Sequence, residues 1–142
     1  MRFVLDCDAY VTLVKHGAAK AAAIRAADAG EIEFLMTHFQ WDEIATLSER
    51  DVRLSICEIP RRNVATHRVM REVSRTQVAV GSAATGPPSI IERGWNRDFL
   101  LSVTAQYEDA LFVTDDVAMW KRATAARVKV WAVARLIARL TL

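Results

Sequence analysis

Short apolar runs alternate along this chain with longer segments of helical character. Four runs are rich in β-branched or aromatic residues, as β-strands are: "RFVL" (2–5), "IEFLMT" (32–37), "ALFVT" (110–114) and "VKVWAV" (128–133). Helical patterns follow them at about 9–29, 38–49, 116–126 and up to about residue 140. Strands separated by helices pair in parallel through right-handed crossovers. The sequence therefore predicts an α/β fold with a central parallel sheet.

Glycine, proline and charge divide the chain further. Gly17 interrupts the first helical stretch, and Gly30 stands where a helix commonly ends in glycine. A long basic helix is expected from Pro60 to about Arg75, followed by a third strand at 77–80, a Gly-, Pro- and Ser-rich loop at 81–89 and a helix at 97–107. No internal repeat or second domain is visible, so residues 1–142 are expected to form a single domain.

Composition excludes several classes of protein. Hydrophobic residues make up 52% and charged residues 25% of the chain, which does not suit a disordered protein. No apolar run approaches the roughly 20 residues of a membrane span, and an acid follows the first three apolar residues of "MRFVLDCDAY". We therefore expect no membrane association and a cytoplasmic location. Cys7 and Cys57 lack CxxC spacing and are expected to be small buried residues.

Acidic residues follow the predicted strands or begin the predicted helices. Asp6 follows the first strand, and Asp115 and Asp116 follow "LFVT". Asp98 opens the helix "RDFLLSVTA", and Glu43 lies on the apolar face of the helix at 38–49. Ligands of open parallel sheets gather outside the carboxyl ends of the strands. A parallel sheet could therefore bring these carboxylates, which are distant in sequence, together at that edge.

Each acid also has an ordinary structural explanation. Asp6, Asp98 and Asp116 stand at helix starts, where aspartate is favoured as a cap. Glu43 could extend to solvent from the edge of its helix. Four independent caps need not converge, whereas a metal site requires convergence.

Four segments together resemble the acidic motifs of PIN-domain nucleases in order and spacing. They are "VLDCDAYV", "THFQWDEI", "RDFLLSVTA" and "LFVTDDVAMW". The resemblance continues through the closing "VKVWAVARLIARL", and the single-domain size is similar to that of VapC-type toxins. It implies a PIN-like three-layer fold, with helices on both faces of the central parallel sheet. It also implies a metal-dependent endoribonuclease, the toxin of a type II toxin–antitoxin pair. RNA as substrate, a cognate antitoxin and a homodimer are implied with it.

The same resemblance assigns roles to individual residues. It makes Asp6, Glu43, Asp98 and Asp116 the metal-binding acids and Thr114 a supporting hydroxyl. Two departures follow from a comparison with the family pattern. Cys7 and Asp8 replace the Thr and the Asn or Ser found in many members after the first acid, and Ala118 replaces a further acid. The sequence thus leaves open whether one or two metals bind, and whether Asp8 or Asp115 joins the site.

Carboxylate chemistry gives the same site a physical basis. Close carboxylates repel one another unless some protonate or a divalent cation binds between them. Ligands made only of oxygen favour Mg²⁺ or Mn²⁺ over zinc. We expect Asp6, Asp98 and Asp116 to coordinate the metal directly, and Glu43 to orient or deprotonate the attacking water.

Positive charge is concentrated in the middle of the chain. The net charge is +2, but residues 50–97 hold nine Lys or Arg against four Asp or Glu. Within this segment Arg68, Arg71 and Arg75 are spaced for one helical face. That face either contacts phosphates or is simply solvated.

Two other functions remain open from the sequence. "VLDCDAYV" also resembles the DxD opening of haloacid dehalogenase-like phosphatases, but Ala9 and Tyr10 stand where Gly and Thr usually follow. The absent acid at Ala118 leaves room for a non-catalytic RNA-binding or partner-binding module on the PIN fold.

Overall fold

Five parallel strands form the central sheet of the computed structural model, which describes residues 1–65 and 97–142, with residues 97 and 98 described by backbone alone. The strands lie in the order β3-β2-β1-β4-β5. The chain begins in the central strand, moves outward to β3 and later resumes on the other side of β1. The strand order therefore reverses between β1 and β4. The strands are β1 (Arg2–Leu5), β2 (Glu33–Met36), β3 (Arg62–Asn63), β4 (Leu111–Val113) and β5 (Val130–Trp131).

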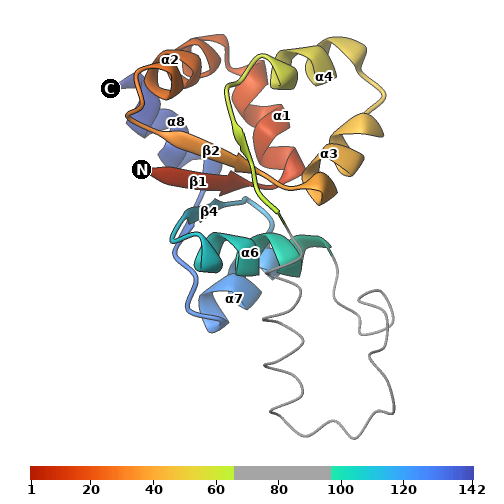
Figure 1. The fold of residues 1–142 in the computed structure, drawn as a ribbon, viewed down its shortest axis with the longest axis vertical. Coiled ribbons are helices and arrows are strands. Elements are labelled where there is room, and N and C mark those ends of the chain that lie inside the picture. Colours follow the sequence, from red (N-terminus) through yellow and green to blue (C-terminus); the bar gives the residue numbers. More distant parts are fainter. Residues whose placement is uncertain (66–96) are drawn as a thin grey trace, which may run out of the picture.

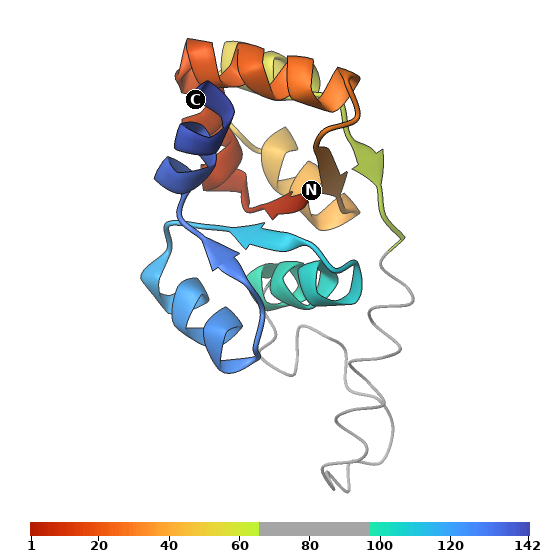
Figure 2. The same cartoon turned by 90° about the vertical axis from the view of Figure 1, so that its left-hand side faces the viewer.

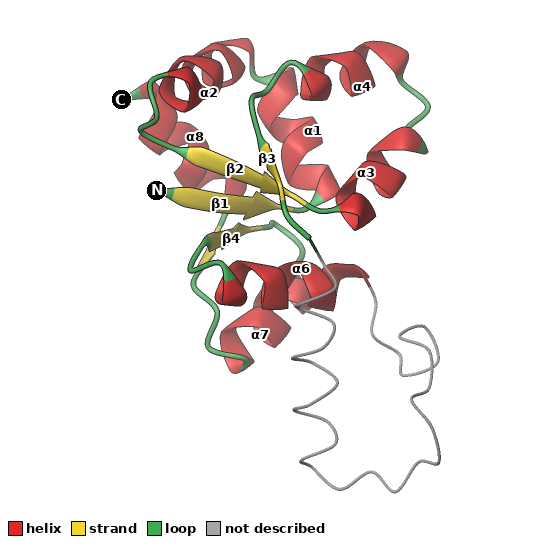
Figure 3. Ribbon diagram, in the orientation of Figure 1, coloured by secondary structure: helices red, strands yellow, loops and turns green. Residues whose placement is uncertain are grey.

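Helices cover both faces of the sheet, as the sequence predicts (Figure 1). One face carries α1 (Cys7–Lys15), α2 (Gly17–Asp28), α3 (His38–Ala45), α4 (Arg50–Cys57) and α8 (Val133–Thr141). The other face carries α6 (Arg97–Tyr107) and α7 (Val117–Ala125). The turned view in Figure 2 and the secondary-structure colouring in Figure 3 show the strands between these two helical layers. No helix among the described residues is long and apolar enough to cross a membrane.

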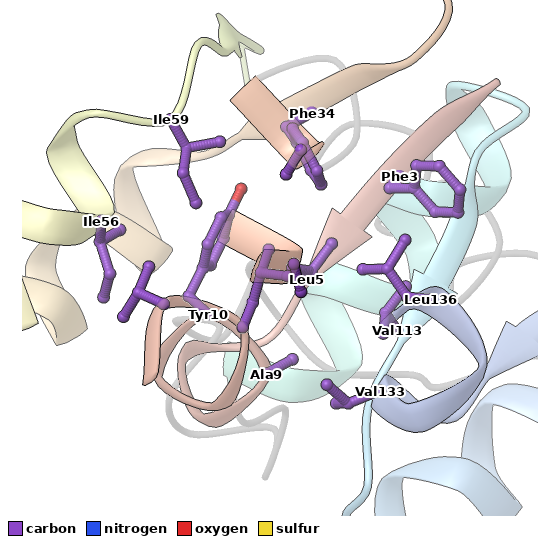
Figure 4. Close-up of a cluster of buried hydrophobic side chains, with 14 of the residues drawn as sticks. Phe3, Leu5, Ala9, Tyr10, Phe34, Ile56, Ile59, Val113, Val133 and Leu136 are labelled. Atoms are coloured by element: carbon purple, nitrogen blue, oxygen red, sulfur yellow. The ribbon is translucent and has the colours of Figure 1, made fainter. Parts of the chain in front are cut away.

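Alternate side chains of the central strands pack into two separate hydrophobic cores, one on each face of the sheet. Phe3 and Leu5 of β1 pack under α1 and α8, whereas Val4 points to the opposite core beneath α6. Figure 4 shows the first core, in which Tyr10 of α1 lies among side chains from the strands and from other helices of the same face. Because successive strand residues point to opposite faces, burial on both sides explains why these strands read as unbroken apolar runs.

The predicted break in the first helical stretch is confirmed. α1 ends at Lys15, and His16 begins α2 by accepting a hydrogen bond at Nδ1 from the Ala19 N–H (3.2 Å). Gly30 follows α2 with φ +74°, and the Gly30 and Glu31 N–H groups donate to the last turn of that helix. This is the Schellman arrangement, in which a left-handed residue ends the helix at low cost only when it is glycine.

The middle of the chain differs from the prediction. Arg62 and Asn63, expected within a long basic helix, form strand β3, which pairs with Leu35 and Met36 of β2. The helix α4 at Arg50–Cys57 was not predicted, and the helix predicted to run to residue 49 ends at Ala45. Cys57 was expected to be buried but is exposed; Cys7 is buried as expected. The predicted strand at 77–80 lies outside the described residues.

Candidate functional site

Asp6 is a buried carboxylate at the carboxyl end of the central strand. Its residue is only 3% exposed. Oδ1 accepts a hydrogen bond from the Ala9 N–H (2.6 Å), which makes Asp6 the cap of α1. Oδ2 accepts a short hydrogen bond from the hydroxyl of Thr114, the residue that follows β4. Both oxygens are thus held in place at the point where the strand order reverses, which is where open parallel sheets bind ligands.

Thr114 connects Asp6 to Asp116. The side chain of Thr114 is completely buried, and its Oγ1 accepts a hydrogen bond from the Asp116 N–H (3.1 Å) while donating to Asp6. Asp116 caps α7, because its Oδ1 accepts from the Met119 N–H (2.9 Å). Capping occupies one oxygen of this exposed carboxylate. The capping interpretation and a ligand role are therefore compatible at Asp116.

The neighbouring acid, Asp115, serves a different helix. Its Oδ1 accepts a hydrogen bond from the N–H of Val133 (2.9 Å), the first residue of α8. α8 and α7 lie on opposite faces of the sheet (Figure 1), so two consecutive carboxylates hold helices in different layers. Asp8, the other candidate for an additional ligand, is exposed in the first turn of α1.

The negative charges of Glu43 and Asp6 both act on the Cys7 thiol. Burial, together with the negative charges of Glu43, Asp8 and Asp6 in that order, raises the pKa of Cys7 to about 12. Glu43 itself is half-buried on α3. The beginning of α1 is therefore surrounded by carboxylates from two helices and a strand end, and Cys7 is a protonated thiol.

Gln40 is a buried residue near this site that sequence reasoning missed. It is 0% exposed; its Oε1 accepts from the Thr37 N–H (2.6 Å) and its Nε2 donates to the Leu5 carbonyl (2.6 Å). Thr37 and Gln40 form a capping box at the start of α3. The spacing Thr-x-x-Gln is a known signal for that box. Nothing in the sequence, however, points to the contact with Leu5.

The remaining predicted site residues fall partly or wholly outside what is described. Asp98 lies in the first turn of α6, as predicted, and Figure 1 shows that α6 begins on the side toward which the β1 and β2 arrows point. Its side chain is not among those described. The predicted phosphate-contacting residues Arg68, Arg71 and Arg75 lie outside the described residues. Among the side chains that are described, no three His, Cys, Asp or Glu lie together as a metal-holding group.

The donors near the reversal point still suit a hard divalent cation. Asp6, Glu43 and Asp116 supply only carboxylate oxygens, and an ionised carboxylate offers two oxygens with about four lone-pair sites in all. Mg²⁺ and Mn²⁺ prefer such oxygen ligands, and Mg²⁺ needs only one or two carboxylates besides water and phosphate. The chemistry of these residues therefore fits the cation that the sequence resemblance implies.

Two solved structures share this fold. One is a chain of VapBC2 from Rickettsia felis bound to a DNA fragment from their promoter, with a TM-score of 0.55 and 15% identity over 93% of this chain and 98% of that chain. The other is PAE2754 from Pyrobaculum aerophilum, with a TM-score of 0.54 and 18% identity over 99% and 98% of the two chains. This similarity confirms the PIN-like, VapC-like fold. No family model and no curated protein matches the sequence.

Proposed function

We propose that this chain is a divalent-metal-dependent endoribonuclease, the toxin of a type II toxin–antitoxin pair. The observation that carries the proposal is the buried Asp6 carboxylate, fixed by Thr114 where the strand order reverses. A carboxylate is costly to bury unless charged or hydrogen-bonding partners meet it. Its position suits a ligand site better than a cap alone, because an exposed aspartate would cap α1 equally well.

In this proposal each site residue has its own role in phosphodiester hydrolysis. Asp6, Asp98 and Asp116 would hold Mg²⁺ or Mn²⁺, and Glu43 would orient or deprotonate the attacking water. Thr114 keeps the Asp6 carboxylate in one orientation by donating its hydroxyl hydrogen to Oδ2. The cation, when bound, lowers the pKa of water and stabilises charge on the phosphate. Asp115 has a supporting role beside the metal ligands, because its carboxylate accepts a hydrogen bond from the first residue of α8 and so holds that helix in place.

The proposed partners rest on the sequence resemblance and the shared fold. VapBC2 from Rickettsia felis has a chain with this fold and was solved on promoter DNA. This agrees with a cognate antitoxin for the present chain. RNA is the proposed substrate, with Arg68, Arg71 and Arg75 as phosphate contacts, and a homodimer is the proposed assembly.

A non-catalytic binding module is the second candidate. It is favoured by one observation: Ala118 stands where many members of the resembled family carry a further acid. RNA or antitoxin binding without metal-dependent cleavage would support it. The phosphatase alternative makes Asp6 a nucleophile, but Ala9 and Tyr10 stand where that family usually carries Gly and Thr. Failure to trap a phospho-aspartate would remove that alternative.

The deciding experiment measures cleavage of structured RNA and of single-stranded DNA with Mg²⁺, with Mn²⁺ and with EDTA. We expect metal-dependent RNA cleavage by the parent and loss of cleavage in Asp6→Asn, which keeps the shape and the cap but removes a charge. Asp51→Asn is the control, because Asp51 is an exposed acid in the first turn of α4. Undiminished cleavage in EDTA or in Asp6→Asn would falsify the assignment.

A further inference from the structure

The hydrogen-bond pattern between β1 and β2 changes at the carboxyl ends of the two strands. The N–H of Glu33 donates to the carbonyl of Met1 (2.8 Å), and the register places Val4 beside Leu35. In a parallel pair such contacts recur at regular spacing, every second residue. Two further steps along the strands, the carbonyl of Leu5 and the N–H of Thr37 would meet.

The side-chain amide of Gln40 stands between these two backbone groups instead. Thr37 N–H donates to Oε1, and Nε2 donates to Leu5 O, each at 2.6 Å. The orientation of the amide is dictated by its neighbours, because a carbonyl can only accept and a backbone N–H can only donate. One primary amide therefore replaces a single hydrogen bond and keeps the strand ends apart by its own width.

On the other side of β1 the ladder continues without a spacer. The Asp6 N–H donates directly to the carbonyl of Val113 (3.2 Å), which keeps the end of β1 next to β4 and Thr114. The separation is thus confined to the β2 side. α3 begins at that side, and Glu43 lies three residues after Gln40 on the same helix.

We propose that Gln40 is a positioning residue that sets the spacing between Asp6 and Glu43. It is anchored at one end to the carbonyl immediately before Asp6 and at the other to the cap of the helix that carries Glu43. The side chain of Gln40 is completely buried and has no contact with solvent. Its hydrogen bonds therefore act only to hold neighbouring parts of the protein in position. This inference rests on the proposed function, in which the two carboxylates act on one cation and its water.

The test compares Gln40→Met, which keeps the length but loses both hydrogen bonds, with Gln40→Ala, which lets the strand ends close. Mn²⁺ affinity is measured by calorimetry and by electron paramagnetic resonance, and RNA cleavage is separated into kcat and KM. We expect the Mn²⁺ dissociation constant to rise by about tenfold or more in both variants, the scale seen when groups behind metal ligands are removed. kcat should fall while KM for RNA stays unchanged, because Gln40 does not reach the surface.

Ile44→Val is the matched control, since Ile44 is buried on the same helix but packs into the apolar core. It should lower the melting temperature and leave Mn²⁺ affinity at the parent value. If Gln40→Met binds Mn²⁺ as tightly as the parent, or if Ile44→Val loses as much affinity as the Gln40 variants, the positioning role is wrong and the proposed function stands. If the parent itself binds no Mn²⁺ and cleaves no RNA, the proposed function fails and this inference fails with it.

Discussion

At the scale of single residues, one hydroxyl organises the acids at the end of the sheet. Thr114 donates to Asp6 and accepts from the backbone of Asp116, so it uses its hydrogen and a lone pair at once. Thr114 was predicted as a supporting residue from the family resemblance, and in the structure the residue before it, Val113, pairs with Leu5 of β1. The specific hydrogen bonds could not be predicted, because they depend on side-chain rotamers that a sequence pattern does not encode.

Thr114→Val should therefore cost more than the loss of one buried hydroxyl. It preserves shape but leaves Asp6 Oδ2 and the Asp116 N–H without their partner, a loss of about 1–3 kcal/mol in unfolding free energy. Thr114→Ser keeps the hydroxyl and should retain most of the cleavage activity. Chemical denaturation and cleavage rates of both variants provide the measurement.

Thr104→Val is the matched control for this substitution. Thr104 is also a buried threonine, but its hydroxyl donates to the Leu100 carbonyl within α6. Its loss should affect stability modestly and cleavage not at all. Equal cleavage by Thr114→Val and Thr104→Val would show that Thr114 has no role in the site.

At the scale of elements, residues with strong local signals were predicted and residues with weak signals were not. Gly30 and the apolar strands were recognised because a glycine after a helix and a β-branched run each have few alternatives. β3 was missed because it consists of Arg62 and Asn63, both exposed and polar. Tertiary pairing with β2 makes those two residues a strand, and no local pattern reports it.

Alanine substitutions at the two glycines that begin and follow α2 should change the free energy of unfolding in opposite directions. Gly30→Ala should lower the unfolding free energy by about 1–2 kcal/mol, because φ +74° is strained for any residue with a Cβ. Gly17→Ala should raise it by about 0.4–1 kcal/mol, since Gly17 begins α2 and an added Cβ meets nothing within 4 Å. Thermal or urea unfolding measures both. A stabilised Gly30→Ala would contradict the left-handed helix ending.

Asp115 and Asp116 offer a way to separate capping from metal binding. Asparagine caps about as well as aspartate, so neither Asp115→Asn nor Asp116→Asn should lower the parent's stability in EDTA. Only Asp116→Asn should lose Mn²⁺ affinity and cleavage, because Asp115 is directed to α8. Loss of Mn²⁺ affinity in Asp115→Asn instead would place that acid in the site, and its role as a cap would be secondary.

At the scale of the whole molecule, charge repulsion and metal binding should both appear in the stability. If Asp98 lies among Asp6, Glu43 and Asp116, then Asp98→Asn relieves like-charge repulsion in metal-free protein and raises the melting temperature. Added Mg²⁺ or Mn²⁺ should stabilise the parent by mass action and stabilise the variant less. Thermal melts in EDTA and at several metal concentrations, at one pH and ionic strength, measure this.

Asp51→Asn controls for the effect of the helix dipole. Asp51 is the second residue of α4, as Asp98 is of α6, and each follows an arginine. Both substitutions should weaken the same dipole interaction, so only the difference between them reports the acid cluster. Identical melting temperatures and identical metal-induced shifts for the two variants would leave Asp98 as a helix-start residue alone.

Both outermost strands of the described sheet, β3 and β5, contain two residues each. A long exposed edge offers unpaired backbone groups to any other chain and promotes aggregation. Here each edge offers very little backbone, and on β3 the Arg62 guanidinium pairs with Glu33 and Glu108 beside it. A second copy therefore gains little by extending the sheet across these edges. Within the described sheet, the two edges therefore disfavour aggregation by strand addition.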